Sequence, residues 1–132
     1  MGTWGAGIYE NDSTRDYADG IINYFVNVIR DIMKWDYKLL HPSMTQSDIL
    51  MCHIDLLIAI CSKDNLYNAL PDTAEIKKWK TKYLEVWEYC INDCDVENDY
   101  KTKRHSVINN RFNTLLALSK KKNKNHSYES HV

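Results

Sequence analysis

Apolar residues recur at helical spacing along most of this chain of 132 residues. In the first such stretch they fall three or four residues apart over about five turns, which predicts a helix that begins near Asp12 or Ser13. The predicted buried face consists of Tyr17, Ile21, Tyr24, Phe25, Val28, Ile32 and Trp35. Gly20 lies inside this helix at a cost of about 1 kcal/mol relative to alanine, and we expect it to allow a close helix crossing.

Two further helices follow the break at Pro42. One is predicted to begin at Thr45 and is apolar on nearly every face through Cys61, which is typical of a helix at the centre of a bundle. The other is predicted to begin at Asp72, where Asp72 and Glu75 form a capping-box pattern. Its predicted apolar face consists of Ile76, Trp79, Tyr83, Val86, Trp87, Cys90 and Ile91.

A last helix is predicted from about Lys101 to Ser119. The chain has only four glycines and two prolines, and three of the glycines lie at the start, which favours long helices over short strands. We therefore predict an all-α fold: one antiparallel bundle of about four principal helices over residues 1–118, preceded by an ordered, glycine-rich N-terminal coil. Residues 119–132 are basic and predicted to be a disordered tail.

The opening residues combine three glycines, a tryptophan and a polar pair. We expect Trp4 and Tyr9 to be buried in the core and Asn11 and Asp12 to cap the first helix. The residues interpreted as a structural motif are Gly2, Trp4, Gly5, Gly7, Asn11 and Asp12. Their pattern, M-G-x-W-G-x-G-x-[FY]-[DE]-N-D, resembles the start of a small bacterial family, domain of unknown function 4259. The resemblance implies a small helical fold, and some members of that family look like candidates for toxin immunity.

Charge is distributed unevenly along the chain. The last 14 residues hold four lysines and one glutamate, which leaves 13 basic and 17 acidic residues, a net charge of -4, in the body. An acidic body is not typical of a protein that binds nucleic acid. Because there is neither a signal-peptide pattern nor an apolar run of membrane-spanning length, we expect a cytoplasmic protein without a membrane partner. The four cysteines are then expected to be free thiols: Cys52, Cys61, Cys90 and Cys94.

Candidate catalytic and metal-binding residues are sparse. Cys90 and Cys94 share a helix face, but no Cys-x-x-Cys pattern accompanies them, and we expect neither a metal nor another cofactor. His53 and Asp55 diverge on their helix and are not expected to pair. A small hydrolase or nuclease of unrecognised type, using His105 with Arg104 and Asp99, stays an alternative.

The segment from Asn92 to Tyr100, here called the acidic hinge, is the strongest candidate for a binding site. Alternate carboxylates resemble a calcium loop, but the central glycine and the final bidentate glutamate of that loop are missing. We interpret the hinge as a docking patch for a basic protein, and the alternative is a solvated connection between helices. The predicted partner-binding residues are Asp93, Asp95, Glu97, Asp99, Tyr100, Glu88 and Trp87.

These observations predict a non-enzymatic protein. The resemblance and the acidic hinge together favour a cytoplasmic immunity protein that covers the active site of a cognate bacterial toxin. The toxin would belong to contact-dependent growth inhibition or another polymorphic system, and a nuclease is one candidate. An interaction module without any toxin is a further alternative.

Overall fold

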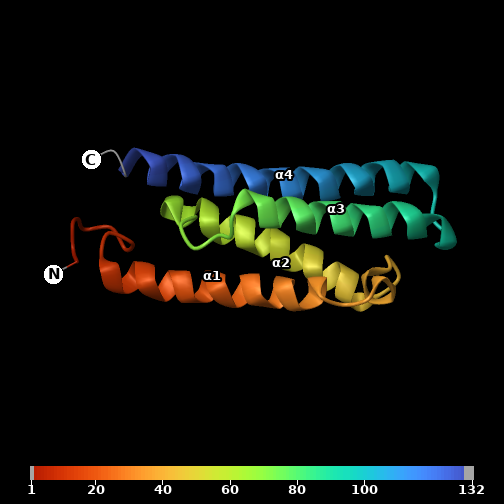
Figure 1. Ribbon diagram of the computed structural model, residues 1–132, viewed down its shortest axis with the longest axis horizontal. Coiled ribbons are helices and arrows are strands. Elements are labelled where there is room, and N and C mark those ends of the chain that lie inside the picture. The colour runs from red at the N-terminus through yellow and green to blue at the C-terminus, as the bar shows by residue number, and fades with distance from the viewer. Residues whose placement is uncertain (1, 130–132) are drawn as a thin grey trace.

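The computed structural model describes residues 2–129, and side chains through Lys122. It contains four long helices, shown in Figure 1: α1 (Asp12–Met33), α2 (Thr45–Ser62), α3 (Thr73–Cys90) and α4 (Asn98–Glu129). Short 3-10 helices lie in the connections: η1 (Tyr37–Leu40), η2 (Lys63–Asn65) and η3 (Ile91–Asp93). This part of the chain contains no strand, only an isolated bridge between Thr3 and Asn11. The predicted all-α class is confirmed.

Successive helices run in opposite directions, and α1 and α4 lie on opposite sides of α2 and α3 in Figure 1. The closest packing joins α1 to α2, α2 to α4 and α4 to α3. By length and composition alone, Thr45–Asn65 could cross a membrane, a test that the core helix of a soluble bundle also passes. In the structure α2 is one wall of the bundle, not an enclosed central helix, since Ile49 and Leu56 are 40% and 44% exposed.

The buried face of α1 differs from the predicted one. It consists of Ala18, Ile22, Val26, Ile29, Ile32 and Met33. Of the predicted face Ile32 is buried and Phe25 and Val28 pack partly against the core, whereas Tyr17 and Tyr24 are 75% and 66% exposed. Both sets have helical spacing, so periodicity alone could not decide which of them faces the other helices. A side chain added at Gly20 would meet nothing within 4 Å, and therefore no helix of the described chain crosses there.

The N-terminal coil closes onto the start of α1. Asn11 is the N-cap, and its Oδ1 accepts a hydrogen bond from the Thr14 amide at 2.8 Å, as predicted. The Asp12 amide donates to the Gly2 carbonyl at 2.7 Å. A Cβ at Gly2 would overlap the Asp12 side chain, so this glycine is required by close packing, not by a positive φ.

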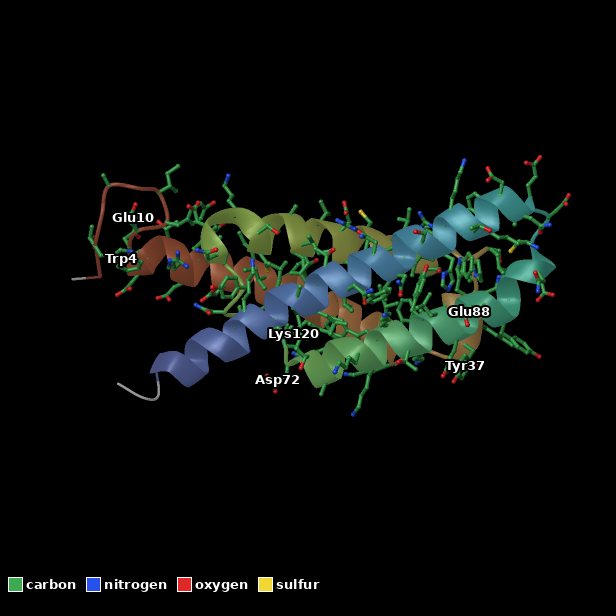
Figure 2. All side chains as sticks on the ribbon, turned by 90° about the horizontal axis from the view of Figure 1, so that it is seen from above. Trp4, Glu10, Tyr37, Asp72, Glu88 and Lys120 are labelled. Carbon is green, nitrogen blue, oxygen red and sulfur yellow. The ribbon has the colours of Figure 1, made fainter. Side chains whose placement is uncertain are left out.

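Trp4 is not a core residue: it is 55% exposed, and Figure 2 shows it beyond the end of the bundle. The coil therefore covers the helix end from outside, and only Tyr9 packs partly against the core. Arg15 holds the coil in place. Its guanidinium lies 5.9 Å from the Trp4 ring centroid and donates to the backbone carbonyls of Tyr9 and Asp64, each at 2.9 Å.

The start of α3 also differs in one detail. Asp72 occupies the N-cap position but makes no side-chain capping bond. Glu75 instead accepts two hydrogen bonds from the Arg30 guanidinium of α1, at 2.7 and 2.8 Å. The predicted apolar face of α3 is confirmed, with only Cys90 half-buried.

Helix α4 extends further in both directions than predicted. It begins at Asn98 and continues past Ser119 to Glu129. Ser119 is fully buried, and its hydroxyl donates to the Pro71 carbonyl at 2.7 Å. Lys122 donates to the Leu70 carbonyl at 2.6 Å. The predicted boundary after Leu118 therefore falls inside a helix that is docked on the α2–α3 connection; residues 130–132 lie outside the described chain.

Candidate partner-binding surface

The acidic hinge lies at the end of the bundle where α3 turns into α4. Asp93 belongs to η3, Asp95 and Glu97 lie in the following loop, and Asp99 is in the first turn of α4. All four side chains are exposed. Asp99 pairs with Lys103 at 3.0 Å, on the same helix. All four carboxylates are therefore accessible to a partner, and Lys103 partly neutralises the charge of Asp99.

Acidic residues continue from the hinge back into α3. From Glu85 to Asp99 the chain contains six carboxylates and no lysine or arginine. The six are Glu85, Glu88, Asp93, Asp95, Glu97 and Asp99. We call this surface the acidic end. Figure 2 places Glu88 and Tyr37 at this end of the molecule, opposite Trp4.

Two predicted residues have different roles from those expected. Trp87 is 5% exposed and belongs to the core, so it is not an anchor for a partner. Glu88 faces α4, where its carboxylate lies 2.8 Å from Nε2 of His105. Tyr100 is 49% exposed, as an anchor must be. The helical spacing of Trp87 was compatible with both a core residue and a surface anchor. The burial of its side chain shows that it is a core residue.

An apolar groove of about 430 Å³ lies beside the hinge, between η1 and the last turns of α3. It is lined by Tyr37, Lys38, His41, Glu85, Val86, Tyr89 and Cys90. Tyr37 and Tyr89 are 57% and 85% exposed. Exposed tyrosines at the edge of an apolar hollow are typical of binding anchors, because each ring offers a large contact area with few rotatable bonds.

The groove wall formed by η1 is fixed by α3. Asp36 caps η1 by accepting a hydrogen bond from the Tyr37 amide at 2.7 Å. Lys82 of α3 donates to the carbonyls of Met33 and Trp35, which satisfies acceptors at the C-terminal end of α1. The same ammonium lies 5.9 Å from the Tyr37 ring centroid. Its charge is thus bound by backbone carbonyls beside the Tyr37 ring.

His41 connects the groove to the hinge. Its Nδ1 accepts a hydrogen bond from the Ser43 amide at 3.1 Å, so in the neutral ring the proton is on Nε2. Nε2 faces the Asp93 carboxylate at 3.9 Å. A carboxylate of the predicted patch therefore lies at the edge of the groove.

Cys90 is an apolar residue of the groove wall. Burial raises the pKa of the Cys90 thiol, and the charges of Asp93 and Cys94 raise it further. Burial also raises the pKa of Cys61 to about 12. Both thiols are protonated at neutral pH and are poor nucleophiles. All four cysteines are free, and no group of three or more metal-ligating side chains converges among the described residues.

The residues of the hydrolase alternative are each engaged elsewhere. His105 pairs with Glu88, Arg104 lies 3.8 Å from Asp48, and Asp99 pairs with Lys103. His53 and Asp55 diverge as predicted: His53 contacts the Ile49 carbonyl, whereas Asp55 pairs with Arg111. Among the described residues, no hydrogen bond or ion pair joins the members of either set to one another.

Sequence reasoning missed the η1 side of the groove. The groove residues Tyr37 and His41 are far from the hinge in sequence, and Glu85 belongs to an earlier turn of α3. The break at Pro42 was the only sequence signal in this region. Family models, curated proteins and solved structures were each compared with the chain, and none of them matches it. The resemblance of the opening residues to domain of unknown function 4259 stays a prediction.

Proposed function

We propose that this chain is an immunity protein that binds and neutralises a cognate bacterial toxin in the cytoplasm, and that the acidic end is its binding surface. The observation that carries the proposal is the cluster of exposed carboxylates at the hinge, beside a groove with two exposed tyrosines. The cations at this surface are Lys38 on the groove wall, Lys101, which donates to Asn92, and Lys103, which pairs with Asp99. Steering charges next to apolar anchors are the combination that fast and tight protein interfaces use.

The expected partner is a toxin domain whose active site is basic. An enzyme that cleaves nucleic acid must attract phosphates, so its active site carries Lys or Arg. The carboxylates of Asp93, Asp95 and Glu97 would take the place of those phosphates. Tyr37 and Tyr89 would then hold an apolar side chain of the toxin against the groove. The chain needs no catalytic residue or cofactor for this role, because covering the active site is sufficient.

The decisive experiment is a protection assay in bacteria that express candidate toxin domains encoded near this chain's gene. Wild-type chain is expected to restore growth. A variant with Asp93→Asn, Asp95→Asn, Glu97→Gln and Asp99→Asn is expected to lose protection while it keeps its thermal unfolding temperature. The hinge contributes little to the core, so the fold should not suffer.

A matched control removes four charges from positions away from the acidic end. Glu10, Asp12, Asp64 and Asp72 are all exposed, and their amide variant changes net charge equally. The control is expected to protect like wild type. Equal protection by both variants would contradict the acidic end as the binding surface, and failure of wild-type chain to protect would contradict the immunity function itself.

A further inference from the structure

Helix α4 carries many basic residues and, after its first turn, almost no acidic ones. Between Tyr100 and Tyr128 the sequence contains eight lysines and arginines and no aspartate or glutamate. Five of the basic side chains are bound within the described chain: Lys101, Lys103, Arg104, Arg111 and Lys122. Lys120 and Lys121 are exposed and make no hydrogen bond or ion pair with the described residues.

The helix itself does not account for these two lysines. Cations stabilise a helix when they lie in its last turn, close to the unpaired carbonyl groups. Lys120 and Lys121 precede Glu129, the last residue of α4, by nine and eight residues, which is more than two turns. Their charges are therefore not explained by capping of the helix end.

The packing of α4 on α3 places Lys120 beside lysines of α3. The contact that fixes the register is the hydrogen bond from Lys80 to Oδ1 of Asn113, at 2.8 Å. Lys120 is seven residues after Asn113, which is two turns further along the same face of α4. Lys77 is exposed and lies one turn before Lys80. Because α3 and α4 run in opposite directions, both steps lead toward the same end of the α3–α4 seam (Figure 1).

The seam is positively charged. We call Lys77, Lys80, Lys120 and Lys121 the basic seam. Figure 2 shows Lys120 near the start of α3, where Asp72 lies. The acidic residues in this part of α3 are Asp72 and Glu75, and Glu75 is bound by Arg30 of α1. Four lysines therefore face one carboxylate that is not already paired, since the partner of Lys80 is a neutral amide.

We propose that the basic seam binds the phosphate backbone of a nucleic-acid duplex without reading its sequence. This activity goes beyond the immunity function and does not depend on it. Lysines neutralise phosphates as point charges and position a protein on a duplex. Proteins that bind single strands stack bases on exposed aromatic rings, and the four residues of the seam are all lysines.

A membrane surface fits the seam less well than a duplex. Peripheral helices bind membranes through buried apolar area as well as through charge. Residues 120–125 of α4 are four lysines and two asparagines, so this stretch of the sequence supplies no apolar side chain. The chemistry of the seam is therefore that of a phosphate-binding surface that stays in water.

The acidic end does not prevent this binding. Asp99 and Lys120 are 21 residues apart on α4, which corresponds to about 31 Å along the helix. Exposed charges are screened beyond about 8 Å at physiological salt. The carboxylates and the basic seam therefore act as separate surfaces, one for a basic protein and one for a polyanion.

Fluorescence anisotropy with a labelled DNA duplex of about 20 base pairs tests this inference. We expect a dissociation constant of about 10⁻⁶ to 10⁻⁴ M at physiological salt, which is typical of binding through phosphates alone. If all four lysines contact phosphates, the logarithm of the association constant should fall with the logarithm of the salt concentration with a slope of about -3.6. A duplex of unrelated sequence should bind equally well.

A variant with Lys77→Gln, Lys120→Gln and Lys121→Gln removes three of these contacts. Its slope is expected to flatten to about -0.9, and its dissociation constant at low salt should rise at least about tenfold. The matched control carries Lys34→Gln, Lys38→Gln and Lys103→Gln, which are exposed lysines outside the seam, and it changes net charge equally. The control should bind like wild type, and both variants should keep their thermal unfolding temperature because all six side chains are exposed.

Three results would overturn the proposal. The first is no binding of the duplex at low salt, and the second is equal weakening by the seam variant and the control. The third is tighter binding to the single strand of the same sequence, or to vesicles of equimolar phosphatidylserine and phosphatidylcholine, than to the duplex. Loss of duplex binding in the seam variant alone would support it.

Discussion

Ser119→Ala is expected to destabilise this protein, although the sequence alone places Ser119 at the start of a disordered tail. The structure gives this hydroxyl a buried role. Ser119 is fully buried on α4 and donates to the carbonyl of Pro71, which is also buried, in the α2–α3 connection. The substitution removes this tie between α4 and the connection and leaves a backbone acceptor without its partner.

The expected loss can be worked out from these two effects. A hydrogen bond contributes about 1 kcal/mol net to stability, and a buried group left without a partner costs about 1–3 kcal/mol. Alanine returns up to about 0.5 kcal/mol through its higher helix propensity. Ser106→Ala, an exposed serine on the same helix, gains the same propensity without losing a buried bond. The difference between the two variants should therefore be about 1–3 kcal/mol.

Urea unfolding followed by circular dichroism measures this difference directly. We expect the midpoint to fall for Ser119→Ala and to stay constant or rise for Ser106→Ala, with equal slopes for both. If the two variants unfold within about 0.5 kcal/mol of each other, α4 is not docked through Ser119 and the account of this end of the bundle is wrong.

Three other predictions concern the ion pair of Glu75, the cysteines of α2 and the exposed Trp4. The hydrogen bonds from Arg30 lower the pKa of Glu75 below its ordinary 4.5. The ionised carboxylate therefore stabilises the fold above that pH, and this contribution is lost as the pH falls through the lowered pKa. Glu75→Gln should be less stable than wild type at pH 7, and the difference in unfolding free energy should shrink toward pH 3. Exposed Cys52 should react with a thiol reagent in the folded protein, whereas buried Cys61 should react only in denaturant; equal rates would show that the α2 face is misassigned. Trp4→Ala should lower the free energy of unfolding by less than about 1 kcal/mol, since Trp4 is exposed and its ring faces only the Arg15 guanidinium. A loss of about 3 kcal/mol or more in thermal unfolding is typical of a buried tryptophan and would show that Trp4 belongs to the core.

Helix positions could be predicted from the sequence more reliably than helix faces. Asn11 marks a helix start through its capping side chain, and the break at Pro42 marks the start that follows at Thr45. Both signals come from residues close in sequence. The α3 face was clear because lysines occupy its other side. In α1, by contrast, Tyr17 and Ile22 belong to two competing apolar stripes, and only the packing of α2 shows which one is buried.

The candidate site was predictable only in its acidic half. The alternating carboxylates of the hinge are adjacent in sequence and visible in the pattern. The groove is not, because Tyr37 and Tyr89 meet across it from segments about 50 residues apart. Trp87 shows the same limit, since its spacing is compatible with either the core or the surface.

Recognition of a basic toxin domain by the acidic end can be measured as the association rate, by stopped flow at increasing salt. We expect wild-type association to slow steeply with salt, because exposed charges are screened beyond about 8 Å at physiological ionic strength. Amide replacement of Asp93, Asp95, Glu97 and Asp99 should slow association and flatten this salt dependence, whereas Tyr89→Ala should mainly speed dissociation, by about tenfold. An unchanged association rate and an unchanged salt slope in the amide variant would contradict the claim.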